Sequence, residues 1–108
     1  KVIPAATLTE VFTVPAGYKA EVSTLFASNH TVNNKTITLY WQHAHDITHK
    51  IYIVFGYVIN ANNYLQFSDS MVMQSGDSIQ VLTEAGSEMS VIASFDLYKE
   101  NTVPFMAD

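Results

Sequence analysis

The sequence predicts an all-β domain, a single antiparallel β-sandwich of about eight strands. Apolar and polar residues alternate with a period of two in several segments, as in strands that place one face on a core. Breaks rich in Gly, Pro, Asn, Asp and Ser recur at close to the spacing of about 8 to 12 residues that is typical of sandwiches. No stretch of roughly 11 residues carries the i, i+3, i+4, i+7 apolar series of an amphipathic helix.

The elements divide the chain into an N-terminal arm at residues 1–6, a sandwich domain at 7–99 and a C-terminal arm at 100–108. Pro4 lies in the first arm, which shows no alternation. The expected strands of the first part of the domain are residues 7–14, 18–29, 35–43, 50–59 and 64–67. Pro15-Ala16-Gly17 predicts a turn between the first two, because Pro fixes φ near −65° and Gly tolerates positive φ.

Two of these strands are predicted to be irregular. Leu25 and Phe26 are adjacent apolar residues, and both cannot face one core on a regular strand. We therefore expect a bulge near Thr24, or a strand that is buried on both faces. Gly56 interrupts an apolar strand and predicts a bulge or a kink there.

The strongest strand signals lie between Met71 and Lys99. An apolar run at 71–74, a Ser-Gly-Asp-Ser turn at 75–78 and a second apolar run at 79–83 predict a strand, a tight turn and a strand. A further break at 84–87 precedes a strand with strict alternation. Its expected core-facing residues are Met89, Val91, Ala93, Phe95 and Leu97.

Length and composition indicate one domain that lies against neighbouring molecules. The chain has 108 residues, enough for a single core. Charged residues make up only 14% of it, against about 25% in a typical soluble domain. A free monomer usually carries more charge, so the low value indicates that much of the surface is covered in an assembly.

Several classes of partner are not expected. The five basic residues are scattered lysines, arginine is absent and the formal net charge is -5, whereas nucleic-acid binding requires clustered cations. The longest apolar run, residues 51–59, is too short to span a membrane as a helix. The chain contains no cysteine, which excludes disulfides and thiolate metal sites.

A histidine-rich connection is the sharpest candidate for a metal site. His43 and His45 would point the same way on a strand, and His49 or Asp46 could complete three ligands. The segment resembles the first cupin motif in part, but His49 stands where that motif has an acid and Ile37 where it opens with Gly. The alternatives are a polar solvated loop, or histidines that meet across an oligomer axis. We expect no metal and no other cofactor.

Catalysis and sugar binding are weaker interpretations. There is no Gly-x-Ser-x-Gly elbow, and Glu84 and Glu88 flank a turn as the end of a hairpin would. An enzyme is therefore not expected. Five aromatic residues could form a carbohydrate platform if they were exposed together, although sandwich cores use the same residue types. They are Tyr40, Trp41, Tyr52, Tyr57 and Tyr64.

The C-terminal arm is unusually apolar, since it contains Val103, Pro104, Phe105 and Met106. An uncovered tail gains nothing from such residues. The arm is therefore expected either to fold back on its own domain or to dock on a neighbouring molecule.

The order of the motifs resembles that of small tailed-phage virion proteins. The segment from Val11 to Val22 contains Thr-Val-Pro-Ala-Gly between two strands. An Asn-containing loop follows at 27–31 and a Thr-rich strand at 35–41, and residues 71–81 contain an apolar strand, Gly-Asp-Ser and Ile-x-Val. The resemblance covers about residues 10–99. It implies a sandwich, often jelly-roll-like, that acts as a capsid decoration (cement) protein or a tail-associated protein.

The resemblance leads us to expect a structural protein at the capsid surface of a virion. Its partners would be the major capsid protein and copies of itself, in a homo-oligomer. The terminal arms would supply the assembly contacts, at Val2, Ile3, Val103, Pro104, Phe105 and Met106. A carbohydrate-binding module and a small cupin-like metalloprotein are the other hypotheses.

Overall fold

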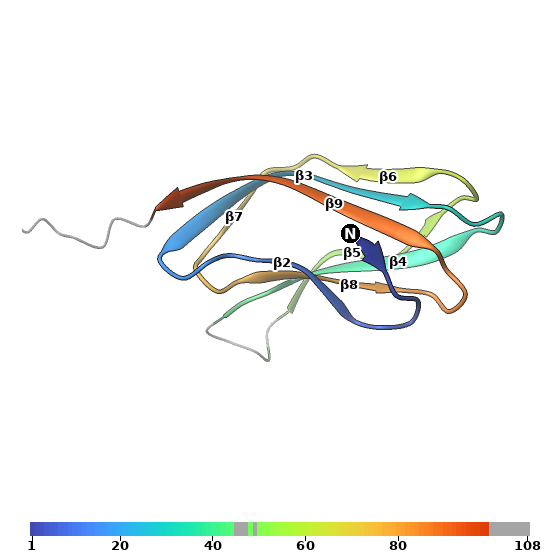
Figure 1. The fold of residues 1–108 in the computed structure, drawn as a ribbon, viewed down its shortest axis with the longest axis horizontal. Coiled ribbons are helices and arrows are strands. Elements are labelled where there is room, and N and C mark those ends of the chain that lie inside the picture. The colour runs from blue at the N-terminus through green and yellow to red at the C-terminus, as the bar shows by residue number, and fades with distance from the viewer. Residues whose placement is uncertain (45–47, 49, 100–108) are drawn as a thin grey trace, which may run out of the picture.

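A computed structural model describes residues 1–44, 48 and 50–99, which form nine strands in two antiparallel sheets packed face to face (Figure 1). The described residues contain no helix, and so none long and apolar enough to cross a membrane. The strands are β1 (Val2–Ile3), β2 (Thr9–Thr13), β3 (Tyr18–Asn29), β4 (Lys35–Gln42), β5 (Lys50–Ile59), β6 (Tyr64–Phe67), β7 (Met71–Met73), β8 (Ser78–Thr83) and β9 (Met89–Lys99).

The strand order is that of a jelly roll. One sheet has the order β1-β9-β3-β6, and the other has the order β2-β8-β4-β5. Outer strands of the sequence pair with each other, β1 with β9 and β2 with β8, and so do the inner strands, β3 with β6 and β4 with β5. This nested pairing is an antiparallel ribbon wrapped around one core. β7 lies beside β3 and continues the edge that β6 begins.

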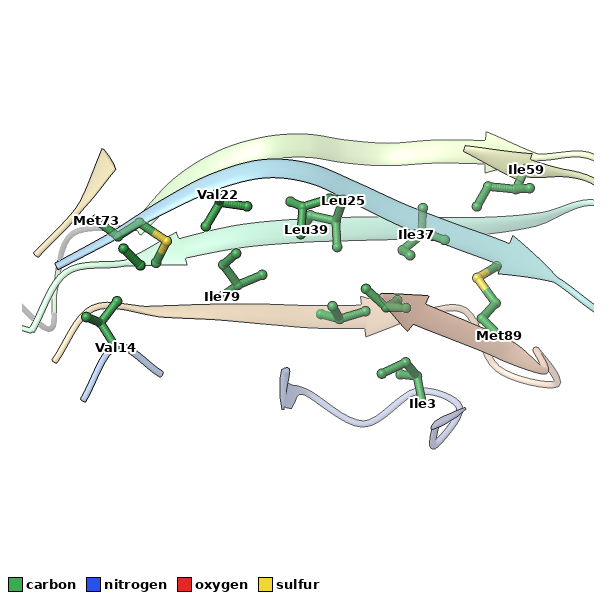
Figure 2. Close-up of a cluster of buried hydrophobic side chains, with 14 residues drawn as sticks. Ile3, Val14, Val22, Leu25, Ile37, Leu39, Ile59, Met73, Ile79 and Met89 are labelled. Carbon is green, nitrogen blue, oxygen red and sulfur yellow. The ribbon is translucent and has the colours of Figure 1, made fainter. Parts of the chain in front are cut away.

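The core lies between the sheets and is formed almost entirely by aliphatic side chains. Figure 2 shows fourteen buried hydrophobic residues from both sheets that point into this layer. Burying one side chain of this size contributes roughly 1.5–3 kcal/mol. The largest fully buried ones are Leu25, Ile37, Leu39, Ile59, Met73, Ile79 and Met89.

The bulge expected near Thr24 is present in β3. Val22 and Leu25 both reach the core although they are three positions apart, because the register with β9 shifts between Val22 and Thr24. The extra residue moves Phe26 to the outer face, where its ring stacks on that of Tyr64 with centroids 5.1 Å apart. Adjacent apolar residues are thus divided between the two faces of one strand.

The N-terminal segment differs from the expected arm. Val2 and Ile3 form β1 and pair with Ser90 and Met89 of β9. The Ile3 side chain is 2% exposed and belongs to the core. A strand of two residues carries no periodic signal, so alternation could not reveal it. The sandwich therefore includes residues before position 7, and the C-terminal arm at 100–108 lies outside the described residues.

The strand, turn and strand expected around Gly76 are present, but the turn passes from one sheet to the other. β7 belongs to the sheet with β3, whereas β8 lies between β2 and β4. Gly76 has φ +84°, and a Cβ placed on it would lie 2.8 Å from the Cβ of Ala44. Glycine is therefore required both by the backbone conformation and by the close approach of the segment that follows β4.

Replacing Gly76 by Ala is expected to lower the free energy of unfolding by about 2–4 kcal/mol, because positive φ and the clash with Ala44 act together. Gly17→Ala is the matched control, since Gly17 has φ +81° but nothing within 4 Å of an added Cβ. It should cost only the backbone strain, about 1–2 kcal/mol. Urea unfolding of both variants measures the difference, and equal losses would show that the contact with Ala44 relaxes freely.

Candidate functional site

The exposed surface of β5 is the main candidate for a functional site. β5 is the last strand of its sheet, and five of its large apolar side chains are exposed. Phe55 is the most exposed of them, at 73%. Tyr52 lies opposite the outward-facing Tyr40, whereas Ile51 and Tyr57 lie opposite Trp41 and Ile37 on the core side of the strand pair. Exposed apolar side chains on an edge strand are typical of a surface that meets another molecule. We call Ile51, Tyr52, Phe55, Tyr57 and Val58 the β5 patch.

An irregular strand positions the aromatic part of this patch. The pairing of β5 with β4 shifts register twice, and one shift spans Gly56, which has φ +56°. The Gly56 N–H donates to the hydroxyl of Thr38 across the strand pair at 2.9 Å. The predicted bulge is therefore confirmed, and it fixes the backbone beside the exposed ring of Phe55.

Three aromatic rings are in contact at this site. Tyr40 of β4 lies opposite Tyr52, with ring centroids 5.0 Å apart, and Phe55 meets Tyr52 edge-on at 4.9 Å. The Lys50 ammonium lies over the Tyr40 ring, 4.9 Å from its centroid. Tyrosines and a cation on an otherwise apolar surface form an amphipathic patch of the kind enriched at protein interfaces.

The geometry of these rings is poorly suited to stacking on sugars. The planes of Tyr40 and Tyr52 are inclined by 45°, and those of Tyr52 and Phe55 by 81°. Of the other aromatic residues expected in a platform, Trp41 packs against the core and Tyr64 belongs to the other sheet. The five residues therefore do not share one flat face.

Asp77 is the principal polar group near the histidine-rich connection. Its carboxylate is buried and accepts hydrogen bonds from the Trp41 indole at 3.1 Å, the Ala44 N–H at 2.9 Å and the Gln74 N–H at 3.0 Å. His43 Nδ1 lies 3.7 Å from the same carboxylate. Burial alone raises the pKa of Asp77, but the hydrogen bonds from Ala44, Gln74 and Trp41, with a smaller effect of His43, lower it below its ordinary value.

The other candidate ligands of this connection, His45, Asp46 and His49, lie outside the described residues. Within the described part of the chain no three His, Cys, Asp or Glu side chains are grouped so as to hold a metal ion. The bonds of Asp77 tie the end of β4 to the turn before β8, so its carboxylate has a structural role in the fold.

Glu84 also connects two segments. Its carboxylate accepts a hydrogen bond from the Thr36 N–H at 2.9 Å and lies 3.6 Å from Lys35 Nζ. The bond from Thr36 is the main cause that lowers the pKa of Glu84. The group thus joins the loop before β9 to the start of β4. Glu88 lies elsewhere, in the lining of a cavity beside β1.

A cavity beside β1 was not predicted from the sequence. It has a volume of about 390 Å³ and is lined by residues 2–5, His30 and residues 87–90. His30 Nε2 lies 3.1 Å from the hydroxyls of both Ser28 and Ser90, which are cross-strand neighbours. A nucleophilic serine needs its base held by a third group. No hydrogen bond of a described residue holds the other nitrogen of this ring.

The predicted assembly contacts fall in different places. Val2 is exposed beside this cavity, whereas Ile3 is buried in its own domain and presents no side chain to a partner. The remaining four, Val103, Pro104, Phe105 and Met106, lie outside the described residues. The unbroken apolar run of β5 could have identified its exposed side chains, because a strand that is apolar on both faces leaves one face uncovered when it lies at the edge of a sheet.

Comparisons with protein families, with curated proteins and with solved structures found no match to this chain.

Replacing Asp77 by Asn is expected to lower the free energy of unfolding at pH 7 by about 1.5–3 kcal/mol, because charge-assisted hydrogen bonds are lost. Since the pKa of Asp77 is depressed, its contribution is present above the unfolded-state value of 3.8 and disappears as the pH falls through the folded-state pKa. The difference from the native protein should therefore shrink as the pH falls below 3.8. Urea unfolding at several pH values measures it. Asp69→Asn, at an exposed carboxylate, should change stability by less than about 0.5 kcal/mol.

Proposed function

We propose that the protein is a structural protein of a tailed-phage virion, a capsid decoration protein that binds the assembled shell through the β5 patch. The observation that carries the proposal is that five large apolar side chains lie exposed on the last strand of a sheet. The order of motifs along the chain supports the phage assignment. The role is associative, and no bond is made or broken in it.

The β5 patch has the chemistry of an interface core. It contains three aromatic residues, and its strand carries no acidic residue although the whole chain has a net charge of -5. Aromatic side chains each bury about 150–250 Å² when fully covered. The patch and its surroundings can thus supply a substantial share of the roughly 800 Å² per partner that a stable interface requires.

The binding would stabilise the shell by mass action. A protein that binds the assembled capsid, and not the dispersed major capsid protein, shifts the equilibrium toward assembly by an amount set by its concentration and affinity. Its low content of charged residues fits a molecule whose surface is largely covered. A tail-associated role is the alternative within the same class of protein.

Tyr52→Ala is expected to weaken binding to undecorated shells of the major capsid protein from the same phage by at least about 10-fold, because buried tyrosines at interface centres commonly contribute more than 1 kcal/mol. Tyr64→Ala is the matched control, since Tyr64 is 58% exposed against 53% for Tyr52 but lies in the other sheet. Copies bound per shell and the shell melting temperature are measured for each variant.

A second matched pair separates the patch from general surface effects. Val58→Lys lies in the patch and Val72→Lys outside it, and the two valines are 51% and 52% exposed. Only Val58→Lys should reduce binding. Equal loss in both members of each pair would contradict the assignment of the patch. A native protein that binds no shell but binds tail assemblies would favour the alternative role.

A further inference from the structure

The cavity beside β1 has the size of a small-molecule site. It is lined by residues 2–5, by His30 and by residues 87–90. β1 runs antiparallel to β9, so the chain passes from Lys1, opposite Val91, toward Met89 and the residues before it. The cavity is therefore bounded by the segment that follows Lys1. Its volume of about 390 Å³ lies within the range of roughly 300–1,000 Å³ that is common for ligand pockets.

Most of the lining is apolar. Val2 and Pro4 are exposed, and Ala5 is half-buried. Ile3 and Met89 lie opposite each other in β1 and β9, and both belong to the core. These two residues are fixed by packing on the rest of the sandwich, so part of the site is formed before any ligand arrives.

Polar groups are gathered at the same end of the sheet. His30 Nε2 lies 3.1 Å from the hydroxyls of both Ser28 and Ser90, and the His30 N–H donates to the Glu88 carbonyl at 2.8 Å. Among the described residues, neither His30 Nδ1 nor the Glu88 carboxylate has a hydrogen-bond or ion-pair partner. A ligand in the cavity can therefore meet a free carboxylate, an imidazole nitrogen and the hydroxyl of Ser90.

The charges of the lining restrict the class of ligand. The residues that line the cavity include no lysine, the chain has no arginine, and Glu88 carries a negative charge. Phosphates and carboxylates are therefore disfavoured. A simple cation would use the carboxylate alone. A neutral ligand with several hydroxyl groups uses the carboxylate, the serine and the imidazole together, and its C–H groups contact the apolar residues.

We propose that the cavity binds one pyranose ring of a neutral saccharide. Such a ring carries hydroxyl groups around its rim and C–H groups on its faces, which matches the division of the lining into polar and apolar residues. Hydroxyl groups of the sugar donate to the Glu88 carboxylate, and others pair with Ser90 and His30 Nδ1. The C–H groups of the ring pack against Val2 and Pro4.

The saccharide site and the β5 patch do not overlap. Ser90 alternates in β9 with the buried residues Met89 and Val91, so it lies on the outer face of its sheet. That sheet contains β1, β9, β3 and β6, whereas β5 belongs to the other one. The site also differs from the aromatic platform considered for β5, because its polar groups are a carboxylate, hydroxyls and an imidazole.

Methyl glycosides of glucose, galactose, mannose, N-acetylglucosamine and rhamnose test the site directly. At least one should bind with a dissociation constant in the millimolar range, as expected for ligands of about 12–16 non-hydrogen atoms. Its binding should shift the NMR signals of residues 2–5, 30 and 87–90. Failure of all five to bind, or shifts confined to the β5 patch, would overturn the proposal.

Glu88→Gln should weaken binding of the best glycoside at least about 10-fold, because hydrogen bonds to a charged acceptor are lost. Asp69→Asn is the matched control, since Asp69 is also an exposed carboxylate but lies outside the cavity. It should leave the affinity unchanged. Equal affinities of the two variants would contradict the role of Glu88 and with it the proposed site.

A second pair of variants tests the hydroxyl of Ser90. Ser90→Val should weaken binding roughly 3- to 10-fold, whereas Ser94→Val, two alternations along the same face of β9, should have no effect. Valine is favoured in strands, so both variants should fold, and urea unfolding checks that they do. An equal loss in both variants would contradict a contact with Ser90.

n-Pentylamine distinguishes a cation site from a saccharide site. It should bind at least about 10-fold more weakly than the best glycoside, and added salt should leave the glycoside affinity unchanged, because a neutral ligand is not screened. Tighter binding of the amine would show that Glu88 acts as a counter-ion and would overturn the proposal. The proposal is independent of shell binding, because Tyr52→Ala should leave the glycoside affinity unchanged.

Discussion

The buried carboxylate of Asp77 is the interaction on which one end of the sandwich depends. It receives hydrogen bonds from the β4 side chain Trp41, from the segment after β4 and from its own turn. The backbone of Asp77 also accepts from Val14, next to the turn between β2 and β3. Asp77 thus joins three connections, of which the turns between β2 and β3 and between β7 and β8 cross between the sheets, whereas the segment after β4 leads to β5 in the same sheet. Such a group is costly to bury without partners, and its bonds outweigh that cost.

The hydrogen bonds of Asp77 also order the surface that we assign to binding. Trp41 and Tyr40 are consecutive in β4, so a strand whose inner face is fixed by the bond to Asp77 presents Tyr40 to the outer face beside Tyr52.

Much of the fold could be predicted from the sequence, because the local patterns of apolar, polar and turn residues agree with the strands that form. Alternation predicted that Met89 and Val91 of β9 are buried, but Phe95 and Leu97, which it also placed on the core, are 39% and 42% exposed. The adjacent residues Leu25 and Phe26 predicted the bulge in β3. The jelly-roll order was available only through the resemblance, since periodicity cannot specify which strands pair. The sites were harder to predict. Nothing in Ser-Gly-Asp-Ser indicates that the carboxylate of Asp77 is buried.

The pairing of β3 with β9 has a consequence for synthesis of the chain. These strands share the longest ladder in the molecule, yet about sixty residues separate the end of one from the start of the other. Contacts between such distant segments form slowly. While the ribosome is still translating the last strand, the completed β3 lacks its principal neighbour. The sheet that contains β3 can therefore be completed only after residues 89–99 have been synthesised.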